Sequence, residues 1–212
     1  MRIGIFGGTF DPIHESHVEM GLDAVRELSL DKLFYVPTRP WQKTARACEE
    51  DRLRMLETAL EPYRDQLVAD TRELTRGGPS YSIDTLYSFR REYGEQTPIF
   101  FVMGSDQWKN LTTWILWQKF PLLANLFVVT RDGSLGENPY GDKFPIVPPS
   151  DAACSEEPSG SICVAKFEPA AYSSPQIRRA LANEMTRDRP IPGLSAQIHQ
   201  YILEHGLYRA EN

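Results

Sequence analysis

The chain has 212 residues, and its 29 Asp and Glu outnumber its 23 Lys and Arg to give a formal net charge of -6. This length suits one α/β domain with a sizeable core, and the acidic balance excludes non-specific binding to nucleic acid or membranes, which needs a basic surface. Three cysteines without C-x-x-C spacing disfavour a zinc site and a disulfide framework, and because no apolar run approaches membrane length we expect a cytoplasmic protein.

The first predicted strand, residues 3–6, runs into a Gly7-Gly8 turn and then into an amphipathic helix. The two glycines remove side chains where the strand ends, so that backbone N–H groups can lie against a ligand. A helix that starts over a sheet edge binds phosphate through its free N–H groups and its dipole. His14 and His17 would lie beside that anion. Each feature alone also fits a plain turn or a solvated helix face.

The rest of the chain alternates strand and helix, which predicts an α/β fold with a doubly wound, mostly parallel sheet of about five to six strands. Further strands are expected at residues 33–36, 66–69, 99–103, 126–129 and 162–167. Helices are expected at residues 51–60, 82–93, 174–181 and 195–205. Residues 132–160 show no periodicity and are interpreted as an irregular surface excursion, so residues 1–212 form one domain that ends in a helical part, residues 173–212.

Two more helix starts could hold a nucleotide. Ser173 and Ser174 open a helix with Arg178 one turn in, which fits either an ordinary cap or a site for distant phosphates. Residues 104–106, Gly-Ser-Asp, follow a buried strand, where open α/β sheets bind ligands. Asp106 could accept from ribose hydroxyls or simply cap a turn.

Three tryptophans, Trp108, Trp114 and Trp117, follow at spacings of six and three. By spacing alone they would be the core side of a helix. A flat aromatic side chain is also the stacking partner that a pyridinium ring needs. The spacing does not decide between these two interpretations.

The motifs together resemble a known family. Residues 7–17, GGTFDPIHESH, resemble the nucleotidyltransferase signature GGTFDPxHxxH, with Ser16 where that family usually has glycine. Residues 172–178 resemble its ISSTxIR motif, with Tyr172 and Pro175 as departures. Together with RGGPSYSIDTL at 76–86, GSD at 104–106, TWxxW at 113–117 and VVTRDG at 128–133, the chain is similar to bacterial nicotinate mononucleotide adenylyltransferases except at residues 132–160.

This resemblance implies a Rossmann-like fold of the nucleotidyltransferase type and adenylyl transfer from ATP to nicotinate mononucleotide, with Mg²⁺ arriving with ATP and no metal site of the protein's own. The catalytic residues it implies are His14, His17, Lys43 and Arg178. The ATP-binding residues are Gly7, Gly8, Thr9, Phe10, Gly104, Ser105, Asp106, Arg131, Ser173 and Ser174. The pyridine-nucleotide-binding residues are Thr85, Trp114 and Ile115. The histidine that the family has just before Lys43 is Gln42 here.

Other activities share the first motif: an adenylyltransferase acting on phosphopantetheine, a cytidylyltransferase, or a nucleotide sensor without catalysis. Trp114 and residues 77–85 favour the pyridine substrate. We expect the acid over the amide mononucleotide, because the N–H and O–H donors around Thr85 and Ile115 suit a carboxylate, provided that Asp84 points away. A homo-oligomer is compatible with the sequence, which does not reveal the oligomeric state.

Overall fold

The computed structural model describes residues 1–39, 45–130, 135–148, 156–165, 170 and 172–210. Its single sheet has seven strands in the order β3-β2-β1-β4-β5-β7-β6, and every neighbouring pair is parallel. The strands are β1 (Ile3–Gly8), β2 (Lys32–Pro37), β3 (Leu67–Ala69), β4 (Ile99–Gly104), β5 (Asn125–Val129), β6 (Ile146–Val147) and β7 (Ile162–Val164).

The parallel α/β architecture is confirmed, and the strand count is one above the range expected from the sequence. The additional strand is β6, which lies within the 132–160 segment that was expected to be irregular. Two residues are too few to show a period-2 pattern, so sequence periodicity could not reveal this strand.

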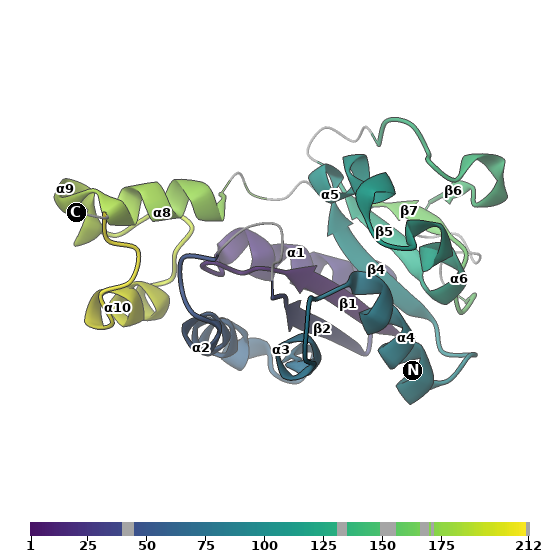
Figure 1. The fold of residues 1–212 in the computed structure, drawn as a ribbon, viewed down its shortest axis with the longest axis horizontal. Coiled ribbons are helices and arrows are strands. Elements are labelled where there is room, and N and C mark those ends of the chain that lie inside the picture. Colours follow the sequence, from purple (N-terminus) through teal and green to yellow (C-terminus); the bar gives the residue numbers. More distant parts are fainter. Residues whose placement is uncertain (40–44, 131–134, 149–155, 166–169, 171, 211–212) are drawn as a thin grey trace.

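Helices cover both faces of the sheet (Figure 1). The α-helices of the described residues are α1 (Glu15–Leu28), α2 (Glu49–Leu60), α3 (Arg72–Thr75), α4 (Ser82–Tyr93), α5 (Ser105–Lys109), α6 (Phe120–Leu123), α8 (Ser174–Ala182), α9 (Glu184–Arg187) and α10 (Ala196–Glu204). Short 3₁₀ turns lie at Glu61–Tyr63, Leu111–Thr113, Trp117–Lys119 and Gly141–Lys143. The expected helices are present, whereas α3 lies in a stretch that was expected to be a loop.

Alternation along the central strands produces two hydrophobic cores. In β4, Phe100 and Val102 join the core beneath α1, α2, α8 and α10, while Phe101 and Met103 join the core beneath α4. A strand covered on both faces is apolar throughout, which explains the uninterrupted run at residues 99–103. The strand order reverses between β1 and β4, so a crevice opens at the carboxyl ends of these two strands.

The C-terminal helices gather at one end of the molecule (Figure 1). Ser173 caps α8 by accepting from the N–H of Gln176, and Gly206 adopts φ 64° just after α10, as a helix-terminating glycine does. Both features were expected from the sequence. No helix of the described residues is long and apolar enough to cross a membrane.

One expectation about the cysteines is corrected. Cys163, buried in β7, is disulfide-bonded, whereas Cys48 is exposed and free. An odd number of cysteines disfavours a framework of several bridges but still allows one pair.

Candidate active site

A cavity of about 500 Å³ opens at the crevice between β1 and β4. Its walls include the last two residues of β1, Gly7 and Gly8, and the start of the first turn at Thr9, together with Asp106, Trp114 and Ile115. Three segments expected from the sequence to bind nucleotide therefore meet at one place, although the first lies about a hundred residues before the other two along the chain. They converge because parallel strands end at the same edge of the sheet.

Gly7 and Gly8 were expected in the first turn, but both still pair with β2 as the last two residues of β1, and the turn follows them. They have different reasons for being glycine. A Cβ added to Gly7 would meet no atom within 4 Å, so the Gly7 backbone faces open space beside the cavity. A Cβ on Gly8 would lie 2.8 Å from the ring of Phe10. Gly7 therefore leaves room for a ligand, whereas Gly8 makes room for Phe10. The Phe10 ring is buried and meets Phe6 edge-on at 5.6 Å, so its observed role is packing beneath the turn.

His14 and His17 stack at the start of α1, with ring centroids 3.7 Å apart and planes 27° from parallel. The backbone N–H of His14 donates to Nδ1 of His17 over 3.3 Å. Burial, with a smaller contribution from the nearby His14, lowers the pKa of His17 well below its ordinary value. A neutral imidazole that accepts at Nδ1 carries its proton on Nε2, so His17 can donate one hydrogen bond from that nitrogen.

The second motif docks on the first. Nη1 of Arg178 donates to the carbonyl of Asp11 over 2.5 Å, and the hydroxyl of Ser174 donates to the carbonyl of Pro12 over 3.0 Å. The start of α8 therefore lies against the first turn. Both side chains contact the protein backbone in this structure, and neither borders the cavity.

The Gly-Ser-Asp segment ends β4 and starts α5. The backbone N–H of Gly104 donates to the side-chain oxygen of Gln107, and Ser105 is the first residue of α5. Of the three residues only Asp106 borders the cavity, where its side chain is exposed. This position suits contact with a ligand hydroxyl.

Only one of the three tryptophans borders the cavity. Trp114 is half-buried and meets Phe101 and Phe120 with ring centroids 6.3 and 5.9 Å away. Trp108 is buried in the core, and Trp117 packs against Tyr140. Trp108 lies on α5, Trp114 follows one 3₁₀ turn and Trp117 begins another, so no continuous helix carries the three rings.

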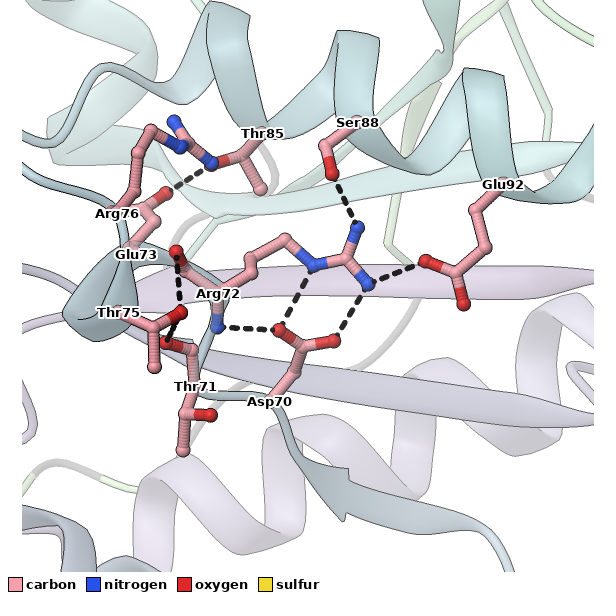
Figure 2. Close-up of polar contacts among 9 residues, drawn as sticks. All are labelled: Asp70, Thr71, Arg72, Glu73, Thr75, Arg76, Thr85, Ser88 and Glu92. Carbon is pink, nitrogen blue, oxygen red and sulfur yellow. Dashed lines mark hydrogen bonds and ion pairs between the residues drawn. The ribbon is translucent and has the colours of Figure 1, made fainter.

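Thr85 does not border the cavity, because its hydroxyl is engaged elsewhere (Figure 2). It donates to Oε1 of Glu73 over 2.5 Å and accepts from Arg76 over 3.3 Å. Glu73 is 3% exposed, and burial raises the pKa of this carboxyl. Asp84 is exposed, as expected. The buried carboxylate beside Thr85 belongs instead to Glu73, which the sequence analysis did not identify. The donor expected at Thr85 is therefore occupied.

Arg72, whose guanidinium donates four hydrogen bonds, holds the unexpected helix α3 in place beside Glu73 and Thr85 (Figure 2). The Arg72 guanidinium donates to Asp70, Ser88 and Glu92 at 2.7 to 3.0 Å and lies 3.4 Å from the ring centroid of Phe89. It ties α3 to α4 and so supports residues 80–82, which border the cavity. No local pattern in residues 70–81 predicts it.

Arg52 was also missed. It is 1% exposed on α2, and Nη1 donates to the carbonyls of Thr9 and Thr38 at 2.6 and 3.0 Å. Its guanidinium thus links the backbone just after β1 to the backbone just after β2. A signal did exist, because Arg52 is four and eight residues from the buried Leu56 and Leu60 and so shares their helix face. Arg39, which borders the cavity and pairs with Glu49 at 2.6 Å, is a further residue without a sequence signal.

Two predicted site residues, Lys43 and Arg131, lie outside the described residues. Within the described part of the chain, no group of three or more His, Cys, Asp or Glu side chains could hold a metal ion. The exposed Asp106 is the only acidic side chain that borders the cavity there.

The sequence matches the profile of the cytidylyltransferase-like family over residues 5–180. A relative from Pseudomonas fluorescens, named probable nicotinate-nucleotide adenylyltransferase, is 35% identical over 100% of this chain and 99% of its own length. A relative of the same name from Bordetella petrii is 34% identical over 98% of this chain and 99% of its own.

The fold is also similar to solved structures. One is a Plasmodium falciparum nicotinic acid mononucleotide adenylyltransferase complexed with NaAD, with a TM-score of 0.75 at 20% identity over 98% of this chain and 97% of that one. A second structure of that name, complexed with APC, has a TM-score of 0.70 at 18% identity over 98% and 96% of the two chains. At these identities the likeness establishes the fold.

Proposed function

Since the chain belongs to the cytidylyltransferase-like family and, within it, to the nicotinate-nucleotide adenylyltransferases, we propose that it transfers the adenylyl group of ATP to nicotinate mononucleotide. The products are nicotinate adenine dinucleotide and pyrophosphate, in a step of NAD biosynthesis. The observation that carries this proposal is the cavity at the β1–β4 crevice, which both the glycine-ended strand β1 and Trp114 border. Backbone N–H groups at a glycine-rich strand-to-helix connection can bind phosphates, and a tryptophan can stack on a flat ring, so one cavity offers contacts for both parts of a nucleotide.

The reaction requires little covalent chemistry from the protein. A 5′-phosphate oxygen of nicotinate mononucleotide attacks the α-phosphorus of ATP, the bond to the β-phosphate oxygen breaks, and pyrophosphate leaves. Phosphate is already a competent nucleophile, so catalysis consists of positioning the reactants and stabilising charge on the phosphoryl oxygens. In this proposal the Gly7 turn admits the phosphates, and the Nε2–H of His17 donates to a phosphoryl oxygen as its charge grows.

The cations in this proposal are Lys43, Arg131 and Arg178. His14 would lie next to the neutral His17. Mg²⁺ entering with ATP would supply charge neutralisation at the phosphates. Arg178 would have to exchange its contact with the Asp11 carbonyl for a phosphate, a short movement for a side chain already at the first turn. The adenylate ribose would lie near Asp106.

The pyridine ring would stack on Trp114, and its acid group would meet the N–H of Ile115. That N–H makes no hydrogen bond to any of the described residues, so it is available to a ligand at the cavity wall. A carboxylate only accepts, whereas an amide would turn its NH₂ toward at least one donor and leave it unpaired. We therefore expect the acid mononucleotide to be preferred.

The decisive test measures pyrophosphate release from ATP in the presence of Mg²⁺ with each of three acceptors: nicotinate mononucleotide, its amide and phosphopantetheine. A reaction without acceptor is the control. The proposal expects release with the first acceptor and a larger kcat/KM for it than for the amide. Release only with phosphopantetheine would identify an adenylyltransferase that acts on that acceptor. The absence of release in every reaction would indicate a protein that binds nucleotide without catalysis. A kcat/KM ratio near one would remove the acid preference while leaving adenylyl transfer intact. Cytoplasmic location and the Mg²⁺ requirement stay predictions.

A further inference from the structure

The carboxylate of Asp11 collects donors from two distant parts of the chain. The residue Asp11 is 5% exposed. Its Oδ2 accepts from the backbone N–H of Arg46 over 2.7 Å, and its Oδ1 accepts from the backbone N–H of Ala47 over 3.1 Å. Its third donor is the hydroxyl of Tyr208, 2.7 Å from Oδ1 and 197 residues away in the sequence. A hydrogen bond to an ionised acceptor is about twice as strong as a neutral one.

Asp11 lies between the glycine turn and the histidines. Phe10, immediately before it, has φ 48°, a left-handed conformation that costs a bulky residue about 1–3 kcal/mol and persists only where surrounding contacts enforce it. Three residues after Asp11, His14 is the N-cap of α1. The direction in which the chain leaves this loop therefore determines where both imidazoles lie.

Tyr208 is held so that it can reach this carboxylate. It follows α10, adopts φ 58°, and packs against the core that contains Phe10 and Ile13. Burial, together with the adjacent Asp11 carboxylate, raises the pKa of Tyr208, so its hydroxyl keeps its proton and donates. The guanidinium of Arg178 lies beside the same carboxylate, with its Nη1 3.9 Å from Oδ2 of Asp11.

We propose that Tyr208 is a positioning residue for adenylyl transfer: its hydroxyl acts through Asp11 to hold the loop at residues 10–14 and thereby places His14 and His17. The inference rests on the proposed function, since it concerns the same reaction. Without the hydroxyl, a buried carboxylate loses one of its donors and can draw Arg178 toward itself. The histidines and the arginine would then both move away from the phosphates.

The chain offers a matched control. Tyr201, on α10, donates its hydroxyl to Oδ1 of Asp51 on α2 over 2.8 Å. Both tyrosines therefore join the C-terminal part to the body of the protein through one hydroxyl–carboxylate bond. Only the bond from Tyr208 ends in the first turn. Replacing each by phenylalanine removes the hydroxyl and keeps the ring.

The experiment compares wild type, Tyr208→Phe and Tyr201→Phe in the pyrophosphate-release assay, with melting temperatures and histidine Cε1–H resonances from NMR. The chain has four histidines, so the His17 resonance can be assigned by substitution. We expect Tyr208→Phe to lower kcat by about tenfold, equivalent to about 1.4 kcal/mol of activation barrier. KM for both substrates should stay within about threefold, because the loss falls on the transition state. The His17 resonance should shift. Tyr201→Phe should leave kcat and that resonance unchanged.

Each outcome has one meaning. Inactive wild type contradicts the proposed function itself. Active wild type with an unchanged kcat in Tyr208→Phe overturns the positioning role, whatever its melting temperature. An equal loss of kcat in both variants also overturns it, because the effect would then come from loosening the C-terminal part. A Tyr208→Phe protein that fails to fold while Tyr201→Phe folds would assign Tyr208 to stability and overturn the proposal.

Discussion

The backbone N–H of His14 points at Nδ1 of His17, 3.3 Å away, and so determines which nitrogen of His17 carries the proton. A nitrogen that accepts has no hydrogen, so the proton of the neutral ring is on Nε2. Burial also lowers the pKa of His17 well below its usual range, which keeps the ring neutral near pH 7. The start of α1 thus presents an N–H donor, not a cation, from this side chain.

Replacing this donor tests its role in the transition state. We expect His17→Ala to lower kcat by about 10²–10³, as loss of one oxyanion donor does, and to leave KM for ATP within a few-fold. Steady-state kinetics at saturating Mg²⁺ measure both constants. His205→Ala, which removes an exposed imidazole stacked on Tyr201, is the control and should retain wild-type rates. A kcat within about threefold of wild type for His17→Ala would make this histidine structural.

The lowered pKa of His17 predicts a loss of stability in acid. In the unfolded chain the imidazole takes up a proton below its ordinary pKa of about 6.5, whereas in the folded protein it stays neutral to much lower pH. The stability due to His17 is therefore complete above about pH 6.5 and falls as the pH drops. Between about pH 7.5 and pH 5, wild type should lose up to about 2 kcal/mol more unfolding free energy than His17→Asn. Urea titrations at the two pH values measure this difference, and equal losses in both proteins would contradict it.

Trp114 should contribute to ligand binding more than to packing. Trp114→Ala is expected to weaken binding of nicotinate mononucleotide by about 1–3 kcal/mol, the range for a lost aromatic–base stack. Calorimetric titration with the mononucleotide measures it. Trp117→Ala is the matched control, because Trp117 is similarly half-buried but packs on Tyr140 away from the cavity. A large fall in melting temperature with unchanged affinity in Trp114→Ala would assign this ring to the core.

Thr85 should affect stability more than substrate binding. Thr85→Val keeps the shape but removes the hydroxyl that donates to Glu73, so a buried carboxyl loses a partner at a cost of about 1–3 kcal/mol. Denaturant unfolding measures this cost. Thr58→Val, which removes a half-exposed hydroxyl bonded within α2, should cost less than about 0.5 kcal/mol. If Thr85→Val instead raised KM for nicotinate mononucleotide at unchanged stability, Thr85 would belong to the pyridine site, as the resemblance to the adenylyltransferases implies.

Features set by near neighbours were predictable. Gly7 leaves the strand end bare, Ser173 caps α8 within its own first turn, and Gly206 ends α10, because each depends on backbone conformation a few residues away. The apolar run at residues 99–103 indicated a strand covered on both faces. Alternating strands and helices then implied a parallel sheet whose carboxyl ends converge, which brought Asp106 and Trp114 to the first turn.

The partners of buried polar groups could not be predicted, because such partners come from distant parts of the chain and only packing brings them together. Glu73 is twelve residues from Thr85, and nothing in either local pattern shows that the hydroxyl turns toward that carboxyl and away from the cavity. Tyr208 reaches Asp11 across 197 residues. The sequence by itself determined the parallel α/β fold and the edge of the sheet where the site lies. Tertiary structure decided which side chains face that site, since a buried donor or acceptor must be paired and the nearest partner in space is rarely the nearest in sequence.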